Sequence, residues 1–187
     1  AASSRAGSAD VLEALGVAID LSPESTVRLV REAGFGFFFA PRYHPAMRFA
    51  APVRTQLGVP TVFNFLGPLV NPARARHQAI GVSDGRMAAV MIGVLQRLGA
   101  DHAFVYYGED GLDEITTTGP SYIYRLKGGE VTHAEFTPED FGVARASAAA
   151  LVGGDGKHNA AILRAVLDGA PGPRRDVAVM NAAPAIV

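Results

Sequence analysis

The chain has 187 residues, which corresponds to about one domain and is long enough to bury a single hydrophobic core. Its 17 basic and 18 acidic residues leave a net charge of −1, so no basic field favours nucleic acid as a partner. A hydrophobic fraction of 49% excludes a disordered chain, and the lack of cysteine excludes disulfides, thiolate metal ligands and a thiol nucleophile. No apolar run reaches the length of a membrane span, and a cysteine-free chain suits the reducing cytoplasm, where we expect the protein to act.

Helices separated by sharp turns are predicted for the first part of the chain. Ser8 is expected to cap a first helix that ends at Gly16. Ser22 is the expected cap of a second helix, with Pro23 at its first position and Gly34 at its end. The second helix therefore carries the stronger signals of the two.

Two short apolar runs flank a third predicted helix. Residues 35–40 and 61–65 are rich in aromatic and β-branched side chains, which favours buried strands. The helix between them covers residues 44–57, and Pro52 inside it is expected to kink or split it. A turn-rich stretch over residues 66–72 follows.

Strands alternate with helices in the rest of the chain. The predicted strands cover residues 77–82, 102–107, 121–126 and 130–136. The predicted helices cover residues 83–98, 159–167 and 176–186. This order predicts an α/β fold with a mainly parallel central sheet flanked by helices, and with an antiparallel pair after residue 120.

An acidic loop directly follows the predicted strand at 102–107. It reads EDGLDE over residues 109–114. Ligands of open α/β sheets gather at the carboxyl ends of strands, and adjacent carboxylates there suit a Mg²⁺ ion that also binds phosphate and water. The alternative is a solvated acidic turn. The threonines at 116–118 could extend a polar lining, or they could reflect β-propensity alone.

Small and hydroxyl-bearing residues open the chain, with SSRAGS over residues 3–8. Free backbone N–H groups and the positive end of a helix would suit a phosphate there. The alternative is a helix cap with a flexible end, since serine commonly caps helices.

Two further polar residues lie in or beside the helix predicted at 44–57. On a helical wheel Arg54 falls on the shoulder of the apolar face, where an arginine either extends to water or meets a carboxylate. His44 precedes Pro45 and is held extended, so it could cap, fill a polar niche or line a pocket. The other histidines show no metal-ligand spacing.

Five segments taken together are more specific than any one of them. They read AASSRAGSADVLEALG at 1–16, FAPRYHPAMR at 39–48, VRTQLG at 53–58, NFLGPLVNP at 64–72 and GEDGLDE at 108–114. In this order, and across essentially the whole chain, they resemble the anthranilate phosphoribosyltransferases of tryptophan biosynthesis. Val70 stands where that family usually has threonine, in a turn that depends mainly on its backbone.

The resemblance implies an activity, a fold and a set of contacts. The family joins anthranilate to phosphoribosyl pyrophosphate (PRPP) and releases pyrophosphate, with Mg²⁺ as cofactor. Its larger domain has the α/β fold shared by nucleoside phosphorylases and phosphoribosyltransferases, and a small helical domain forms the homodimer. The residues that match its PRPP contacts are Ala1, Ala2, Ser3, Ser4 and Ser8. The residues that match its Mg²⁺ carboxylates are Asp113 and Glu114, and those that match its anthranilate site are Arg54, His44 and Pro68.

The resemblance also sets expectations for the domain and for rival functions. The family's KHGNR and GTGGD motifs are expected upstream of Ala1 and its last helices beyond Val187, so residues 1–187 are expected to be one α/β domain truncated at both ends. One rival is a pyrimidine nucleoside phosphorylase-like enzyme of the same fold, which would not need an arginine aimed at an aromatic carboxylate. The other is a non-catalytic relative that binds nucleic acid, which the near-neutral charge disfavours.

Overall fold

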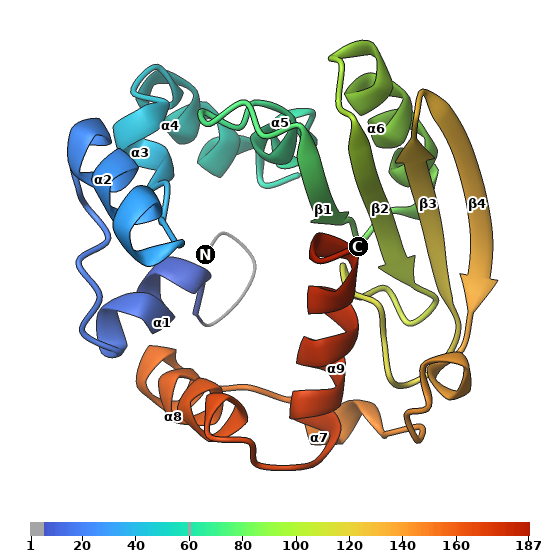
Figure 1. Cartoon of the computed structure of the whole chain (residues 1–187). Coiled ribbons are helices and arrows are strands. Elements are labelled where there is room, and N and C mark those ends of the chain that lie inside the picture. Colours follow the sequence, from blue (N-terminus) through green and yellow to red (C-terminus); the bar gives the residue numbers. More distant parts are fainter. Residues whose placement is uncertain (1–5, 60) are drawn as a thin grey trace. The chain divides into compact units, whose positions relative to one another are not determined.

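The computed structural model describes residues 6–59 and 61–187, and it divides into two compact units (Figure 1). The helical unit comprises Ala1–Thr61 and Gly153–Ala165, and its described part contains helices and loops. The sheet unit comprises Val62–Val152 and Val166–Val187 and contains the four strands of the described chain. Within the described residues, no helix has both the length and the apolar character needed to cross a bilayer.

The helices of the helical unit follow the signals in the sequence in part. They are α1 (Ser8–Ala14), α2 (Pro23–Ala33), α3 (Ala40–Tyr43), α4 (Met47–Leu57) and most of α8 (Gly156–Leu167). The Ser22 hydroxyl caps α2 by accepting the Ser25 N–H at 3.2 Å, and Gly34 ends this helix with a φ of 74°. The prediction for α2 is therefore confirmed. α4 continues through Pro52, so of the two expected effects, a kink or a split, the split does not occur.

Two of the predicted strands are wrong, because a short apolar run does not distinguish a strand from other packed segments. Residues 35–39 form no regular element, and Gly36 packs so closely on α2 that an added Cβ would lie 2.5 Å from a methyl group of Val30. The run at 61–65 leads instead into α5 (Phe63–Leu69), whose Phe65 and Leu69 lie one turn apart and pack against the core of the sheet unit. Tertiary packing outweighs β-propensity at both places.

The four strands form one mixed sheet, in the order β1 (His77–Gly81), β2 (His102–Gly108), β3 (Ser121–Lys127) and β4 (Glu130–Phe136) (Figure 1). β1 pairs with β2 in parallel, whereas β2–β3 and β3–β4 pair antiparallel. The α/β class and the antiparallel pair after residue 120 are confirmed, but the sheet is mixed and not mainly parallel. Parallel strands need a crossover that is usually helical, and of the connections between these strands the one from β1 to β2 contains a helix, α6 (Gly85–Arg97).

Each face of the sheet has its own hydrophobic core. α6 covers one face, and its Met91, Ile92 and Leu95 are fully buried there. On the other face Phe104 and Tyr106 of β2 pack with Ile115 and with Met180 of α9 (Pro173–Ala182). The remaining short elements of the unit are η1 (Pro138–Phe141), α7 (Ala148–Leu151) and η2 (Ala183–Ala185). The acidic loop therefore leaves β2 on the face that α9 covers.

Candidate active site

The loop after β2 is organised around the side chain of Asp110. Its carboxylate accepts hydrogen bonds from the Thr116 hydroxyl at 2.7 Å, from the Thr118 hydroxyl, and from the Leu112 N–H at 3.1 Å. Burial acts to raise the pKa of Asp110, but these hydrogen bonds outweigh it and hold that pKa below its ordinary range. Asp110 is thus an ionised carboxylate whose lone pairs are used to shape the loop.

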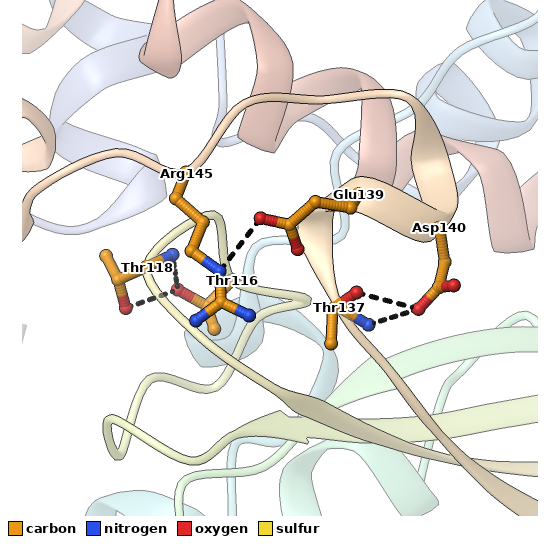
Figure 2. A network of polar contacts seen from close by, with 6 residues as sticks. All are labelled: Thr116, Thr118, Thr137, Glu139, Asp140 and Arg145. Carbon is orange, nitrogen blue, oxygen red and sulfur yellow. Dashed lines mark hydrogen bonds and ion pairs between the residues drawn. The ribbon is translucent and has the colours of Figure 1, made fainter.

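Hydrogen bonds from backbone N–H groups to hydroxyl and carbonyl oxygens fix the part of the loop that returns to β3. The Thr116 N–H donates to the Ser121 hydroxyl at 2.9 Å, and the Ala146 N–H donates to the Thr117 C=O at 2.9 Å. Figure 2 shows Thr118 beside Thr116, to whose hydroxyl the Thr118 N–H donates at 3.1 Å. Thr116 and Thr117 are fully buried, and β3 begins only at Ser121, so these threonines belong to the loop and not to a strand.

The segment that carries Ala146 is itself held in place. At the start of η1 the Thr137 N–H and hydroxyl donate to the Asp140 carboxylate at 2.7 and 2.9 Å (Figure 2). Arg145 then donates to Glu139 at 2.9 Å. A short capped turn and an ion pair therefore support the loop from outside.

A close backbone contact fixes Asp113 against β1. A Cβ built on Gly81 would lie 1.7 Å from the Asp113 carbonyl oxygen, which is too close for any residue with a side chain. Glycine at position 81 therefore permits the loop to lie directly on the strand. This contact sets the position of the peptide group between Asp113 and Glu114.

Asp113 and Glu114 reach the surface next to each other at the carboxyl end of β2. Protein atoms crowd the Glu114 carboxyl, and this loss of hydration, together with the negative charge of Asp113, raises the pKa of Glu114 to about 7. Beneath them the buried hydroxyl of Tyr106 has its pKa raised to about 12, by burial first and then by Glu114 and Asp113. A cation at this place would relieve the repulsion between the two carboxylates.

The donor set fits a magnesium ion that shares its coordination with a ligand. Within residues 6–59 and 61–187 no group of three or more His, Cys, Asp or Glu side chains is placed to hold a metal. Two carboxylates are nevertheless enough for Mg²⁺, which keeps several waters and takes other oxygens from phosphate groups. The sheet unit could therefore hold a metal–phosphate complex through Asp113 and Glu114.

The predicted contacts of the helical unit lie on its short helices. Ser8 is the first residue of α1 and not its cap, because Gly7 is the N-cap and the Asp10 carboxylate accepts the Gly7 N–H at 2.7 Å. His44 joins α3 to α4: its N–H donates to the Ala40 C=O at 2.8 Å, and its side chain is half-buried. His44 is thus a linker between two helices whose ring remains partly accessible.

Arg54 lies in the last turn of α4 and is half-buried. The apolar stripe beside it is exposed within the described chain, with Phe49 at 71% and Val53 and Leu57 at 55% each. The sequence placed Arg54 at the shoulder of this stripe, and it is better covered than the stripe itself. An arginine held in this way can present its planar fork to a carboxylate.

The structure groups only some of the predicted site residues. Asp113, Glu114 and the exposed Pro68 of α5 belong to the sheet unit, whereas Ser8, His44 and Arg54 belong to the helical unit. The predicted PRPP contacts Ala1, Ala2, Ser3 and Ser4 lie outside the described residues. The residues that sequence reasoning missed are Gly81, Tyr106 and Asn181, and it did not foresee that Asp110 of the acidic loop shapes that loop. Asn181 alone left a signal, as a polar side chain within an apolar helical pattern.

The whole chain, residues 1–187, matches the model of the glycosyl transferase family, a/b domain. The chain belongs to this family. Curated relatives agree: anthranilate phosphoribosyltransferase of Rhodopseudomonas palustris strain TIE-1 is 52% identical over 187 residues, which is 100% of this chain and 55% of that protein. Its counterpart in Rubrobacter xylanophilus is 55% identical, with the same coverage. The chain spans about half the length of the curated relatives it matches.

Solved structures of this family share the fold. Anthranilate phosphoribosyltransferase from Thermus thermophilus is 46% identical, with a TM-score of 0.92 over 100% of this chain and 55% of that one. The enzyme from Saccharomyces cerevisiae in complex with PRPP and Mg is 27% identical, with a TM-score of 0.84 over 95% of this chain and 52% of that one. The same yeast enzyme is also known in complex with 4-fluoroanthranilate. The resemblance noted in the motifs is confirmed, and the α/β fold is that of a phosphoribosyltransferase.

Proposed function

We propose that the protein carrying this chain transfers the phosphoribosyl group of PRPP to the amine of anthranilate, as a step of tryptophan biosynthesis. In this reaction the bond from the anomeric carbon to a pyrophosphate oxygen breaks, a bond from the same carbon to the anthranilate nitrogen forms, and the amine loses a proton. The observation that carries the proposal is the pair Asp113 and Glu114, held at the carboxyl end of β2 in a chain that matches this family throughout.

The donor side of the reaction involves the carboxylates of the sheet unit and the serine-rich segment at the start of the chain. Asp113 and Glu114 would hold a Mg²⁺ ion on the pyrophosphate, as the repulsion of the Glu114 carboxylate by Asp113 favours. When bound, this ion neutralises the charge that develops on the leaving pyrophosphate. The serine-rich segment with Ser3, Ser4 and Ser8 and the backbone of Ala1 and Ala2 would position the phosphoribosyl group.

The helical unit supplies most of the acceptor side. Arg54 would bind the anthranilate carboxylate through a charge-assisted hydrogen-bonded pair, and the family resemblance assigns His44 and Pro68 to the same substrate. Binding through the carboxylate orients the aromatic ring, so that its amine faces the anomeric carbon. The rate gain is then mainly positioning and electrostatic stabilisation.

No residue of the chain is needed as a general base before attack. The aromatic amine of anthranilate is neutral near pH 7, so its lone pair is already available. The proton is lost only as the new bond forms. We accordingly assign binding and orienting roles to the residues named above, and no proton transfer.

The experiment that tests the proposal uses the full gene product, because the chain covers about half of its relatives. The protein is incubated with PRPP, anthranilate and Mg²⁺, and the release of pyrophosphate is measured with and without each substrate. Release that requires both substrates and the metal is the expected result. Phosphorolysis of thymidine or uridine without anthranilate-dependent release would favour the nucleoside phosphorylase instead, and a salt-dependent shift of a nucleic-acid band without either activity would favour the binding protein.

We further propose that the full gene product is a homodimer in the cytoplasm. The lack of cysteine supports a reducing compartment, and the family resemblance supports the dimer. Sedimentation of the full gene product measures its mass directly, and a monomeric mass at micromolar concentration would contradict the dimer.

A further inference from the structure

The side chain of Asn181 in α9 binds both backbone groups of Ile115, 66 residues away in sequence. Its Oδ1 accepts the Ile115 N–H at 2.7 Å, and its Nδ2 donates to the Ile115 C=O at 2.9 Å. The second Nδ2 proton goes to the Val177 C=O, one turn back in α9, at 2.8 Å. Both N–H donors and the oxygen acceptor of this amide are therefore used. Among side chains, only the amides of asparagine and glutamine combine two such donors with an acceptor.

Asparagine at this place needs a reason beyond the helix itself. It is a weak helix former, because its amide competes for backbone partners, and here it lies in the last turn of α9. The preceding residue, Met180, is 2% exposed and packs against Ile115, so this face of α9 lies on the acidic loop. The partner that explains Asn181 is thus Ile115.

The contact controls the backbone of Glu114. The Ile115 N–H belongs to the planar peptide group that begins at the Glu114 Cα, so the bond to Asn181 fixes the plane on the C-terminal side of Glu114. The plane on its N-terminal side contains the Asp113 C=O, which lies against Gly81. Both peptide planes that flank Glu114 are therefore held, one by β1 and one by α9.

We propose that Asn181 is a positioning residue for the carboxylates of Asp113 and Glu114, acting through the peptide group of Ile115. The inference rests on the proposed function, in which these carboxylates hold the metal–pyrophosphate complex. Short carboxylate side chains have few torsions with which to correct a displaced backbone. A shift of the Ile115 peptide therefore moves the metal ligands themselves.

The chain contains a matched control for this contact. Asn159 in α8 forms the same kind of clamp on another loop: its Oδ1 accepts the Gly154 N–H at 2.8 Å and its Nδ2 donates to the Gly154 C=O at 3.2 Å. Gly154 has no acidic pair beside it. Replacing either asparagine by leucine keeps a side chain of similar size and leaves the backbone N–H and C=O of Ile115 or Gly154 without these partners.

The test compares Asn181→Leu with Asn159→Leu in the full gene product. For Asn181→Leu we expect hydrogen exchange at Ile115 to be about tenfold faster, and the Mg²⁺ concentration for half-maximal turnover to rise about tenfold or more. We also expect a smaller rise in Tm on adding Mg²⁺ with pyrophosphate, and an anthranilate KM within about twofold of the original, because the acceptor contacts lie on other elements. Asn159→Leu should lower Tm and leave the Mg²⁺ dependence unchanged.

Two outcomes overturn the proposal. In the first, Asn181→Leu and Asn159→Leu lower Tm by similar amounts, and turnover in both variants depends on Mg²⁺ concentration as it does in the original protein. In the second, exchange at Ile115 accelerates and the effect of Mg²⁺ with pyrophosphate on Tm is unchanged. The exchange and Tm measurements need no turnover, so an original protein without phosphoribosyl transfer would refute the proposed function and still leave the role of Asn181 measurable.

Asn181→Asp covers the case in which the leucine variant does not fold. Aspartate keeps the acceptor for the Ile115 N–H and loses the donors to the Ile115 and Val177 carbonyls. Its added negative charge alone would strengthen cation binding. A higher Mg²⁺ requirement in this variant therefore comes from lost positioning, and an unchanged or lower one contradicts the proposal.

Discussion

The two units of the chain hold their candidate residues in different ways. The sheet unit fixes the backbone around Asp113 and Glu114 from several elements, through Gly81, Asp110 and Asn181. The helical unit carries Arg54 on a helix of 11 residues whose apolar stripe is exposed. Within the described residues the hydrophobic side chains that the helical unit buries are Ile19 and Ala160. We therefore expect the helical unit to open at a lower free energy than the sheet unit.

The difference follows from what each side chain must do. A carboxylate that binds Mg²⁺ has two or three torsions and a narrow range of acceptable geometries, so its backbone has to be placed in advance. An arginine has a long flexible stem and can adjust to the carboxylate it meets. For the proposed reaction we therefore expect rigidly held metal ligands and an adaptable arginine for the acceptor. Substitutions can test each of the two separately.

The largest effect is expected from removing the metal ligands. Asp113→Asn combined with Glu114→Gln should reduce Mg²⁺-dependent turnover by about 100-fold or more, since both side chains proposed to bind the ion lose their charge. Turnover as a function of Mg²⁺ concentration is the measurement. Glu130→Gln, an exposed change on β4, is the control and should leave the curve unchanged. A double variant with the original metal dependence would refute the role of the pair.

Arg54→Ala tests the acceptor side. Loss of a charge-assisted contact costs roughly 1.5–3 kcal/mol, so the KM for anthranilate should rise about 10- to 150-fold while the KM for PRPP changes little. Steady-state kinetics with each substrate varied in turn provide the measurement. Arg48→Ala is the matched control, because Arg48 is an exposed arginine of the same helix whose guanidinium lies over the Phe49 ring. Equal changes in both KM values for Arg54→Ala would contradict the assignment.

Gly81→Ala tests how rigidly the donor side is held. The added methyl would collide with the Asp113 carbonyl, so the free energy of unfolding should fall by about 1–3 kcal/mol, with a raised Mg²⁺ requirement. Urea unfolding measures the first effect and turnover the second. Gly93→Ala in α6 is the control, because nothing lies within 4 Å of an added Cβ there, and it should stabilise by about 0.5–1 kcal/mol. A Gly81→Ala protein as stable as the original would show that the loop is not tightly held.

Some of these features could be predicted from the sequence and others could not. The place of the acidic pair after a strand was predictable, because a strand followed by adjacent carboxylates is a local pattern, and its binding of metal stays a prediction. The mixed sheet was predictable in part: residues 109–120 contain no helical pattern, and without a crossover β3 had to return antiparallel. The helical conformation of the run at 61–65 could not be predicted, because the packing of Phe65 and Leu69 against the core of the sheet unit decides it. The bonds of Asn181 and the contact of Gly81 join residues far apart in sequence, so no local pattern contains them.

The smallest expected effect is a pH dependence of the acid pair. The pKa of Glu114 is raised to about 7 from its ordinary 4.5, chiefly by loss of hydration and also by Asp113. A raised carboxyl pKa means that the folded protein binds this proton more tightly than the unfolded chain does. Without metal, the protonated carboxyl therefore stabilises the fold fully below about pH 4.5, and this contribution is lost as the pH rises through about 7. Tyr106 faces the same group but has a pKa of about 12 and does not titrate in this window.

Metal binding reverses the sign, because Mg²⁺ needs the ionised carboxylate. The rise in Tm on adding Mg²⁺ with pyrophosphate should therefore be larger at about pH 8 than at about pH 6. Pyrophosphate also titrates, so the same measurement is made on Glu114→Gln as the reference. The difference between the two proteins in the rise of Tm is then the part that Glu114 causes. A difference that does not change with pH would mean that Glu114 is already ionised at about pH 6, and that the crowding around its carboxyl is too slight to hold the proton.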